Sequence, residues 1–198
     1  MPVIFLSHGA PTLVFEPIPA RDFMIGLAAT LPQPTSILCV SAHWQAPLPT
    51  VSTARRPETI HDFFGFPDEL YRLRYPAPGA PGLARRALEL LAAAGIAGAL
   101  DEARGLDHGA WNPLLLVYPE ANIPVAQIAL IDGGDAAAHV AVIGSVSETW
   151  ETQTEARLLL ECIRLMHGNE HRLRGNYADI EALTGVLRLN RSAPNERA

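Results

Sequence analysis

The sequence has few of the features that mark thiol-dependent or nucleic-acid-binding proteins. Only two cysteines occur among 198 residues, Cys39 and Cys162, and they do not form a C-x-x-C pair. A thiolate zinc site or a redox dithiol is therefore not expected, and Cys39, which lies in an apolar run, is predicted to be an inert buried thiol. No basic run occurs and the net charge is −6, which argues against nucleic acid as a partner.

Long apolar segments and the common catalytic motifs are also missing. No apolar stretch approaches the roughly 20 residues that span a bilayer, and the apolar N-terminus lacks the basic region of a signal peptide. We therefore expect a cytoplasmic protein with no membrane partner. The sequence contains no G-x-S-x-G elbow, phosphate loop, G-x-G-x-x-G or H-E-x-x-H motif. The hydrophobic fraction of 48% is that of a globular domain, so a core can form without disulfides.

Two of the seven histidines follow short apolar runs that are typical of buried strands. Residues 3–6 precede His8, residues 37–40 precede His43, and residues 21–31 between them have the spacing of a helix. This order predicts strand, helix, strand, with a histidine at the exit of each strand. In open α/β sheets, sites gather at the carboxyl ends of strands. Neutral imidazoles that converge there can bind one transition-metal ion; alternatively, each histidine caps its own loop, and the spacing alone leaves both open.

The segment 55–81 is rich in proline and aromatic residues, and long irregular segments of this kind are usually functional covers or binding loops. His61 lies within it, and the adjacent Asp62 could orient its ring. Three phenylalanines could form an apolar wall for an aromatic substrate: Phe63, Phe64 and Phe66. The alternative is a loop that is packed by its own aromatic side chains.

The next elements are predicted with less ambiguity. Residues 81–94 have the apolar spacing of a helix that stops at Gly95. A second helix is expected to begin after Asp107 as N-cap, which places His108 at its start. There the helix dipole favours a neutral ring that can hydrogen-bond substrate oxygens, although a plain helix-start role beside Trp111 is equally consistent with the pattern.

Downstream, residues 123–131 are predicted to form a strand and residues 132–135 a loop. The character of the sequence changes after that loop: residues 151–166 have the pattern of an amphipathic helix, and residues 187–198 are typical of a frayed end.

Six sequence islands, taken together, resemble one family. The chain is similar to the class III extradiol aromatic ring-opening dioxygenases of the DODA type (4,5-DOPA dioxygenase-like, the LigB superfamily), and the resemblance covers residues 1 to about 132. The matching islands are FLSHGAPT at 5–12, VSAHW at 40–44, TIHDF with GFP at 59–67, YPAPG at 75–79, GLDHGAW at 105–111 and YPEANIP at 118–124.

This resemblance implies an α/β fold, a three-layer sandwich with a central mixed or parallel sheet. It also implies a mononuclear non-haem site for Fe(II), with Zn(II) as another occupant, that inserts O₂ into a catechol ring next to the diol. By position, His8 and His43 match metal ligands and His108 matches a histidine that contacts the substrate. His61 matches a residue that lines the pocket, and we take it with His108 as a candidate catalytic residue. Phe63 and Phe66 are expected to bind the substrate, together with His108. The expected partners are a small aromatic diol and O₂, with a homo-oligomer left open.

Residues 1–135 are thus expected to form a catalytic α/β domain. Residues 136–198 are expected to be a divergent or truncated C-terminal region, because the family's Gly-Ser-Gly-x-x-x-His-Asn loop and its last metal ligand have no match there. This region is also expected to be mostly helical. The predicted function is an extradiol ring-cleavage dioxygenase. The alternatives are a non-catalytic, degenerate or truncated relative and a zinc-dependent hydrolase that uses the same histidines.

Overall fold

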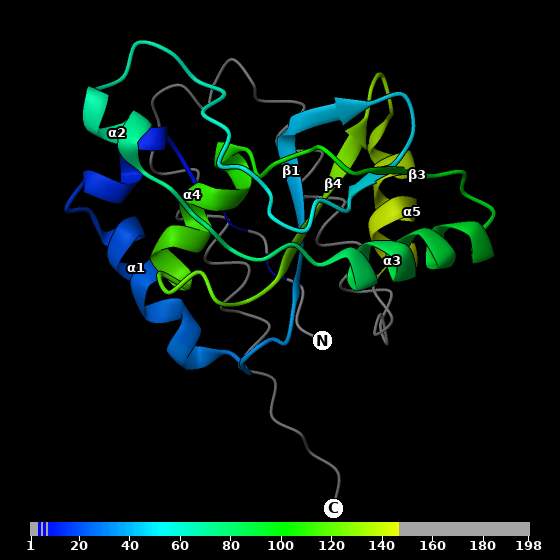
Figure 1. Cartoon of the computed structure of the whole chain (residues 1–198), viewed down its shortest axis with the longest axis horizontal. Helices are drawn as coiled ribbons and strands as arrows, with labels where there is room; N and C mark the ends of the chain where they lie inside the picture. Colours follow the sequence, from blue (N-terminus) through cyan, green and yellow to red (C-terminus); the bar gives the residue numbers. More distant parts are fainter. Residues whose placement is uncertain (1–3, 5, 7, 147–198) are drawn as a thin grey trace, which may run out of the picture. The chain divides into compact units, whose positions relative to one another are not determined.

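A computed structural model describes residues 4, 6 and 8–146 of the chain (Figure 1). All of these residues belong to one structural unit. Its helices and strands follow one another in this order: η1 (Pro11–Phe15), α1 (Pro19–Leu27), η2 (Ala28–Thr30), β1 (Ile37–Ala46), β2 (Thr50–Ser52), α2 (Asp68–Arg72), α3 (Pro81–Ala93), β3 (Ala99–Asp101), α4 (His108–Val117), β4 (Val125–Ile131) and α5 (Ala136–Val146).

The described strands form a four-stranded mixed sheet in the order β1-β4-β2-β3. β1 runs parallel to β4 and β2 parallel to β3, whereas β2 and β4 are antiparallel. The two longest strands, β1 and β4, lie side by side (Figure 1), and their register starts at the pair Ile37–Val125. The mixed sheet that the resemblance implied is thereby confirmed.

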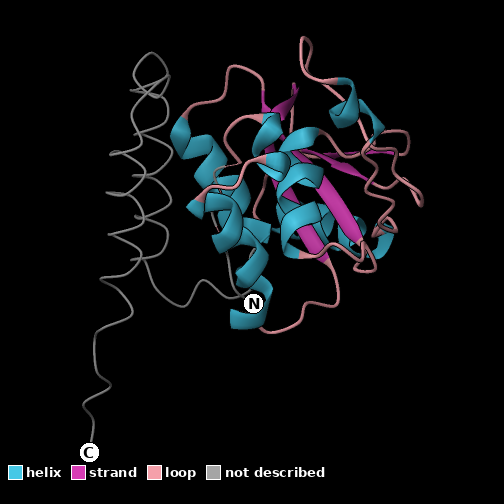
Figure 2. Ribbon diagram, turned by 90° about the vertical axis from the view of Figure 1, so that its left-hand side faces the viewer, coloured by secondary structure: helices cyan, strands magenta, loops and turns pink. Residues whose placement is uncertain are grey.

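Helices cover both faces of the sheet, which makes three layers (Figure 2). Because side chains alternate along a strand, Val125 packs with one core and its neighbours Ala126 and Ile128 with the other. The first core lies under α1 and α4 and includes Met24, Leu27, Trp111 and Leu114. The second lies under α3 and α5 and includes Ala84, Ala87, Leu91 and Val142.

Several predicted elements are present with nearly the predicted bounds. The helix expected over residues 21–31 is α1 followed by η2, and α3 begins at Pro81 as expected. Gly95, with φ of +73°, lies in the left-handed conformation that commonly ends a helix. The strand predicted over residues 123–131 begins two residues later, at Val125.

Other predictions need correction. Ile4 and Leu6, the described members of the strand predicted at residues 3–6, belong to no strand, and Ile4 is 44% exposed, so this part of the apolar run is not buried in the sheet. The strand predicted to end at residue 40 continues as β1 to Ala46, because Gln45 and Ala46 pair again with β4. The helix predicted at 151–166 and the frayed end lie outside the described residues.

Two expectations drawn from what the sequence lacks can be compared with the described part of the chain. None of its helices is both long and apolar enough to cross a membrane. Cys39 has a free thiol, and desolvation by burial, with a contribution from the charge of Asp107, raises its pKa to about 12. A thiol with so high a pKa is unreactive at neutral pH, as predicted, but Cys39 is half-buried and not fully buried as expected. Cys162 lies outside the described residues.

Candidate metal centre

Three histidines from distant parts of the sequence converge at one end of the sheet. One ring nitrogen from each of His8, His43 and His108 lies within 4.8 Å of the others. The Nε2 atoms of His8 and His43 are 3.1 Å apart, and the ring centroids of His43 and His108 are 4.0 Å apart. The cluster therefore contains the two histidines predicted as metal ligands and the one predicted to contact substrate.

His43 reaches the cluster because β1 is interrupted by a bulge. Ser41 pairs with Ala129 and Gln45 with Leu130, the next residue of β4. Residues 42–44 are thus extra residues with no partner in the ladder, and His43 is the middle one. Bulges often re-aim a side chain next to a functional site.

His108 is the first residue of α4, and its ring is held by a carboxylate from the irregular segment. Asp62 Oδ1 accepts hydrogen bonds from the backbone N–H and from ring Nδ1 of His108, both at 2.9 Å. Because Nδ1 donates its proton to this carboxylate, the lone pair of the neutral ring lies on Nε2. Asp62 was expected to orient His61; the structure shows it bound to His108 instead.

The residue before His108 also behaves differently from its prediction. Asp107 occupies the N-cap position of α4, as expected, but its side chain makes no capping hydrogen bond. It turns away from the helix start and accepts a hydrogen bond from the Ser41 hydroxyl at 2.6 Å. Asp62 satisfies the free N–H of the first helical residue in its place.

The site favours neutral imidazoles. Burial, together with the neighbouring rings of His108 and His43, lowers the pKa of His8 from 6.5 to about 4. Burial and the ring of His108 also lower the pKa of His43. Burial by itself would raise the pKa of Asp62, but its hydrogen bonds from His108 outweigh this and hold the pKa below the ordinary value. At neutral pH the cluster therefore offers lone pairs beside an ionised carboxylate.

This donor set fits a divalent transition metal. Neutral imidazole nitrogens are the usual ligands of such ions. Two nitrogens bound at about 2.1 Å to one ion lie about 3 Å apart when their bonds meet near a right angle, and His8 Nε2 and His43 Nε2 have this spacing. In the neutral tautomer whose Nδ1 donates to Asp62, His108 Nε2 offers a third lone pair, which can face either a metal or a bound substrate.

The stability of the metal-free chain should fall as the pH is lowered from about 6.5 to 4. The pKa of His8 in the folded state is below its unfolded value. The contribution of the neutral His8 ring to the free energy of unfolding is therefore complete above pH 6.5 and is lost as the ring is protonated. We expect a loss on the order of 1–2 kcal/mol, allowing for partial solvation. Urea unfolding at several pH values would measure it. The His8→Gln variant should show a flatter profile, and an unchanged slope would contradict this assignment.

Gly109, the second residue of α4, is required by close packing. A Cβ atom there would lie 2.8 Å from His43 Cδ2 and even closer to the Ser41 hydroxyl. The Gly109→Ala variant is therefore expected to displace the His43 ring and to weaken metal binding by about tenfold or more. Isothermal titration with Fe(II) under anaerobic conditions would measure this loss.

The matched control for Gly109→Ala is Gly82→Ala in α3, where nothing lies within 4 Å of an added Cβ. This control should retain full affinity and gain about 0.5–1 kcal/mol of stability, as is usual for glycine in a helix. Equal metal affinities for the two variants would contradict the role of Gly109.

Aromatic residues of segment 55–81 pack beside the histidine cluster. The ring of Phe63 lies 5.5 Å from that of His108 and 5.4 Å from that of Phe66, edge to face in both cases. Phe64, predicted to join this wall, is 92% exposed, so its ring does not pack into it. The rings of Tyr71 and Trp111 also lie near that of Phe63, and neither was predicted to join this wall.

The histidines outside the cluster have other partners. His61 Nε2 is 3.1 Å from the carbonyl oxygen of Leu73, and its ring packs against Phe63 and Trp111. The structure therefore does not bring His61 into the group of three. His139 is buried and accepts the backbone N–H of Ile131. His167 and His171 lie outside the described residues.

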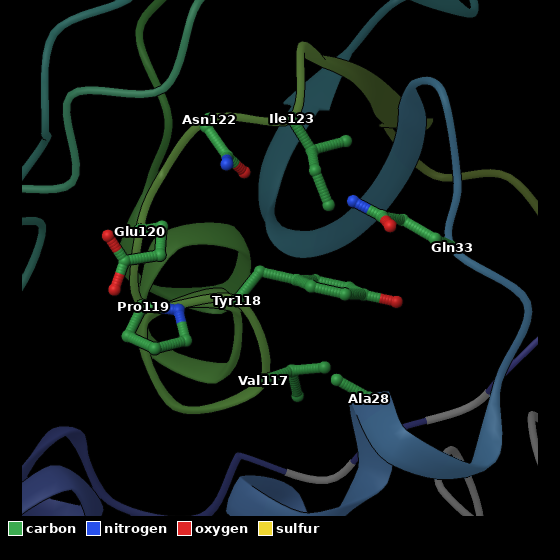
Figure 3. A pocket seen from close by; sticks show the side chains of 8 residues that line it. All are labelled: Ala28, Gln33, Val117, Tyr118, Pro119, Glu120, Asn122 and Ile123. Carbon is green, nitrogen blue, oxygen red and sulfur yellow. The ribbon is translucent and has the colours of Figure 1, made fainter.

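A separate hollow of about 280 Å³ lies at the far end of α4 (Figure 3). Its lining residues are Ala28, Gln33, Val117, Tyr118, Pro119, Glu120, Asn122 and Ile123. None of them is a histidine, and α4 separates the hollow from His108 by the length of the helix. It is not part of the candidate metal centre.

The α/β sandwich and the histidines that converge at one end of its sheet agree with the fold and the metal site that the resemblance implied. Residues 3–144 match the family described as the catalytic LigB subunit of aromatic ring-opening dioxygenase. The chain belongs to this family, and the resemblance inferred from its motifs is confirmed.

Several relatives carry dioxygenase names. The 4,5-DOPA dioxygenase extradiol of Portulaca grandiflora is 46% identical over 139 residues, which cover 68% of this chain and 51% of the relative. The protein of the same name from Escherichia coli K12 is 46% identical over 140 residues, covering 70% and 51%. Dioxygenase tasH of Hapsidospora irregularis is 38% identical over 151 residues, covering 70% and 47%. The chain thus spans about half the length of the curated relatives it matches.

One solved structure is also similar. The crystal structure of an uncharacterized protein from Escherichia coli K12 is 38% identical, with a TM-score of 0.49, and the match covers 61% of this chain and 44% of that one.

Proposed function

We propose that the chain is an extradiol ring-cleavage dioxygenase that opens a catechol-type aromatic ring with O₂ at a mononuclear non-haem metal. The observation that carries this proposal is the convergence of His8, His43 and His108 at one end of the sheet in a member of the LigB family. The dioxygenase names of its relatives support the same reaction class. A cytoplasmic location remains a prediction, and the oligomeric state is left open as before.

His8 and His43 are the proposed metal ligands. Their Nε2 spacing and lowered pKa values favour a cation that binds neutral imidazole. We propose Fe(II) as the occupant, with Zn(II) as the alternative ion for the same nitrogens. When bound, the metal would supply adjacent open positions that hold the diol and O₂ together, so that proximity does much of the work.

His108 is proposed to bind the diol. Because Asp62 holds the Nδ1 proton, the Nε2 lone pair can accept a hydrogen bond from a substrate hydroxyl and take up its proton. Asp62, ionised at neutral pH, stabilises the resulting positive ring. In this arrangement Asp62 keeps the orientation and tautomer of His108 constant.

Phe63 and Phe66 are proposed to bind the aromatic ring of the substrate. Phe63 packs edge to face on His108, so a substrate ring bound at His108 would contact this apolar wall. His61 would line the outer part of the same pocket, next to Phe63. An apolar wall also limits the access of water to the reacting diol.

Turnover in matched atmospheres tests the reaction class. The full chain loaded with Fe(II) should consume O₂ and form a coloured ring-opened product from a catechol such as DOPA, and it should be inactive without oxygen. Hydrolytic activity that persists without oxygen and follows added Zn(II) would instead support a zinc-dependent hydrolase. Absence of both activities would leave a non-catalytic relative.

A further inference from the structure

A buried carboxylate directly precedes His108 in the sequence and has no role in the proposed chemistry. Asp107 is 0% exposed, and its oxygens accept hydrogen bonds from the Ser41 hydroxyl, the Arg104 guanidinium and the Gln127 side-chain amide. The Arg104 guanidinium also forms a salt bridge with the Asp107 carboxylate, with 3.0 Å between the nitrogen and the oxygen. A buried ion needs such partners to be tolerated, but these partners also connect Asp107 to the segment that carries His43.

The first connection runs through Ser41. Its hydroxyl donates to Asp107 Oδ1 at 2.6 Å and accepts the backbone N–H of His43 at 3.2 Å. Ser41 is the last residue of β1 that pairs with β4 before the bulge. The amide of His43 therefore has a side-chain acceptor in place of a strand partner, and the orientation of that acceptor is set by Asp107.

The second connection runs through Arg104. Its guanidinium donates to Asp107 Oδ2 and lies 5.0 Å from the centre of the Trp44 ring, a distance typical of a cation–π contact. Trp44 is buried and follows His43 in the bulge. The bulge is therefore held at two points, and both lead to the same carboxylate.

Asp107 is at the same time part of the start of α4. Its carbonyl oxygen accepts the backbone N–H groups of Ala110 and Trp111 at 3.0 and 2.9 Å, and the next residue is His108. One residue thus joins the bulge that carries His43 to the helix start that carries His108.

We propose that Asp107 and Ser41 are positioning residues that hold the His43 bulge against the start of α4 and so set the spacing of the His43 and His108 rings. Neither side chain would touch metal or substrate. The effect on ring spacing follows from the contacts of this network alone, whereas the effect on metal affinity rests on the proposed function.

Ser41→Ala is the most direct test, because changing Asp107 would also leave Arg104 without its carboxylate. The matched control is Ser52→Ala. Ser52 is similarly buried, and its hydroxyl likewise accepts a backbone N–H, that of Gln127 at 2.8 Å. It reaches Asp107 only through Gln127, whereas Ser41 contacts both Asp107 and His43 directly. Both variants lose one buried hydroxyl, so a general loss of stability would appear in both.

The readout is the NMR nuclear Overhauser effect between the ring protons of His43 and His108 in the metal-free full chain, with anaerobic Fe(II) affinity as a second measurement. The original chain and Ser52→Ala should show the ring-to-ring cross-peak, and Ser41→Ala should weaken or lose it. Ser41→Ala should also bind Fe(II) about tenfold or more weakly than Ser52→Ala, as is usual when a group that orients a ligand is removed.

A cross-peak and an affinity in Ser41→Ala equal to those of Ser52→Ala would overturn the proposal. If Ser41→Ala does not fold, Ser41→Cys, which keeps a weak donor and acceptor, replaces it and should show a smaller loss of the same cross-peak. If the original chain binds no Fe(II), the proposed function fails, but the comparison of cross-peaks still decides whether Ser41 and Asp107 position the rings.

Discussion

Replacing His43 with alanine is expected to weaken Fe(II) binding by the full chain by at least about 100-fold. Loss of an outer partner of a ligand alone costs about 10–100-fold in metal affinity, and loss of one of two proposed ligands should cost at least the upper end of that range. His43 Nε2 is 3.1 Å from His8 Nε2, so its removal leaves a single nitrogen of the proposed pair. Anaerobic isothermal titration of the full chain would measure the change.

His61→Ala is the matched control for His43→Ala. It removes an imidazole that lies outside the cluster of three and bonds the backbone at Leu73. Its Fe(II) affinity should stay close to that of the original chain. If the two variants bind Fe(II) equally well, His43 is not a metal ligand.

Asp62→Asn is expected to lower kcat by about 100-fold while Fe(II) binding is largely retained, because positioned acid–base help is typically worth 10²–10⁴-fold. The amide could not accept the ring proton of His108 with the strength of a carboxylate, so the orientation and tautomer of the ring would no longer be fixed. Steady-state oxygen consumption with a catechol would give kcat and KM separately.

Asp68→Asn is the control for this change. Asp68 is an exposed carboxylate in the same segment, at the start of α2, and its variant should retain kcat. A kcat for Asp62→Asn as high as that of Asp68→Asn would contradict the role given to the Asp62–His108 pair. A parallel loss of Fe(II) affinity and kcat would show that Asp62 acts on the metal ligands instead.

Local sequence patterns predicted much of the fold because they report local physics. The apolar period, the first-turn proline and the terminal glycine of α3 all lie within one stretch of sequence, and the helix has the predicted bounds to within one residue. The bulge in β1 could not be predicted from a local sequence pattern. It depends on the register with β4, which lies more than 80 residues further along the chain, and no local signal marks residues 42–44 as extra.

The same distinction applies to the two aspartates near the site. Asp62 was paired with His61 because they are neighbours in sequence, but in the fold the two side chains contact different groups. His61 turns to Leu73 and Asp62 to His108. Asp107 was expected to cap its own helix; in the fold it finds Ser41, Arg104 and Gln127 instead, and these are partners that only the tertiary structure brings within reach.

The convergence of histidines, in contrast, was open to prediction. His8 and His43 were predicted to converge because each follows an apolar run, although Ile4 and Leu6 lie in no strand and β1 continues past His43 to Ala46. A role for His108 at the same site was implied by the family resemblance and not by its spacing. What the pattern did not reveal is that the ring of His108 lies nearer to that of His43 than the ring of His8 does, with centroid distances of 4.0 and 5.1 Å. That spacing depends on Gly109, which lets α4 approach the bulge closely.

The central claim is that His8 and His43 hold one metal ion at which a catechol is opened by O₂. The most direct test is an anaerobic titration of the full chain with Fe(II), followed by addition of DOPA and then of air. We expect one iron per chain, loss of binding in both His8→Ala and His43→Ala, and a yellow ring-opened product that forms only after oxygen is admitted. Weak or absent binding, with no coloured product, would contradict the claim.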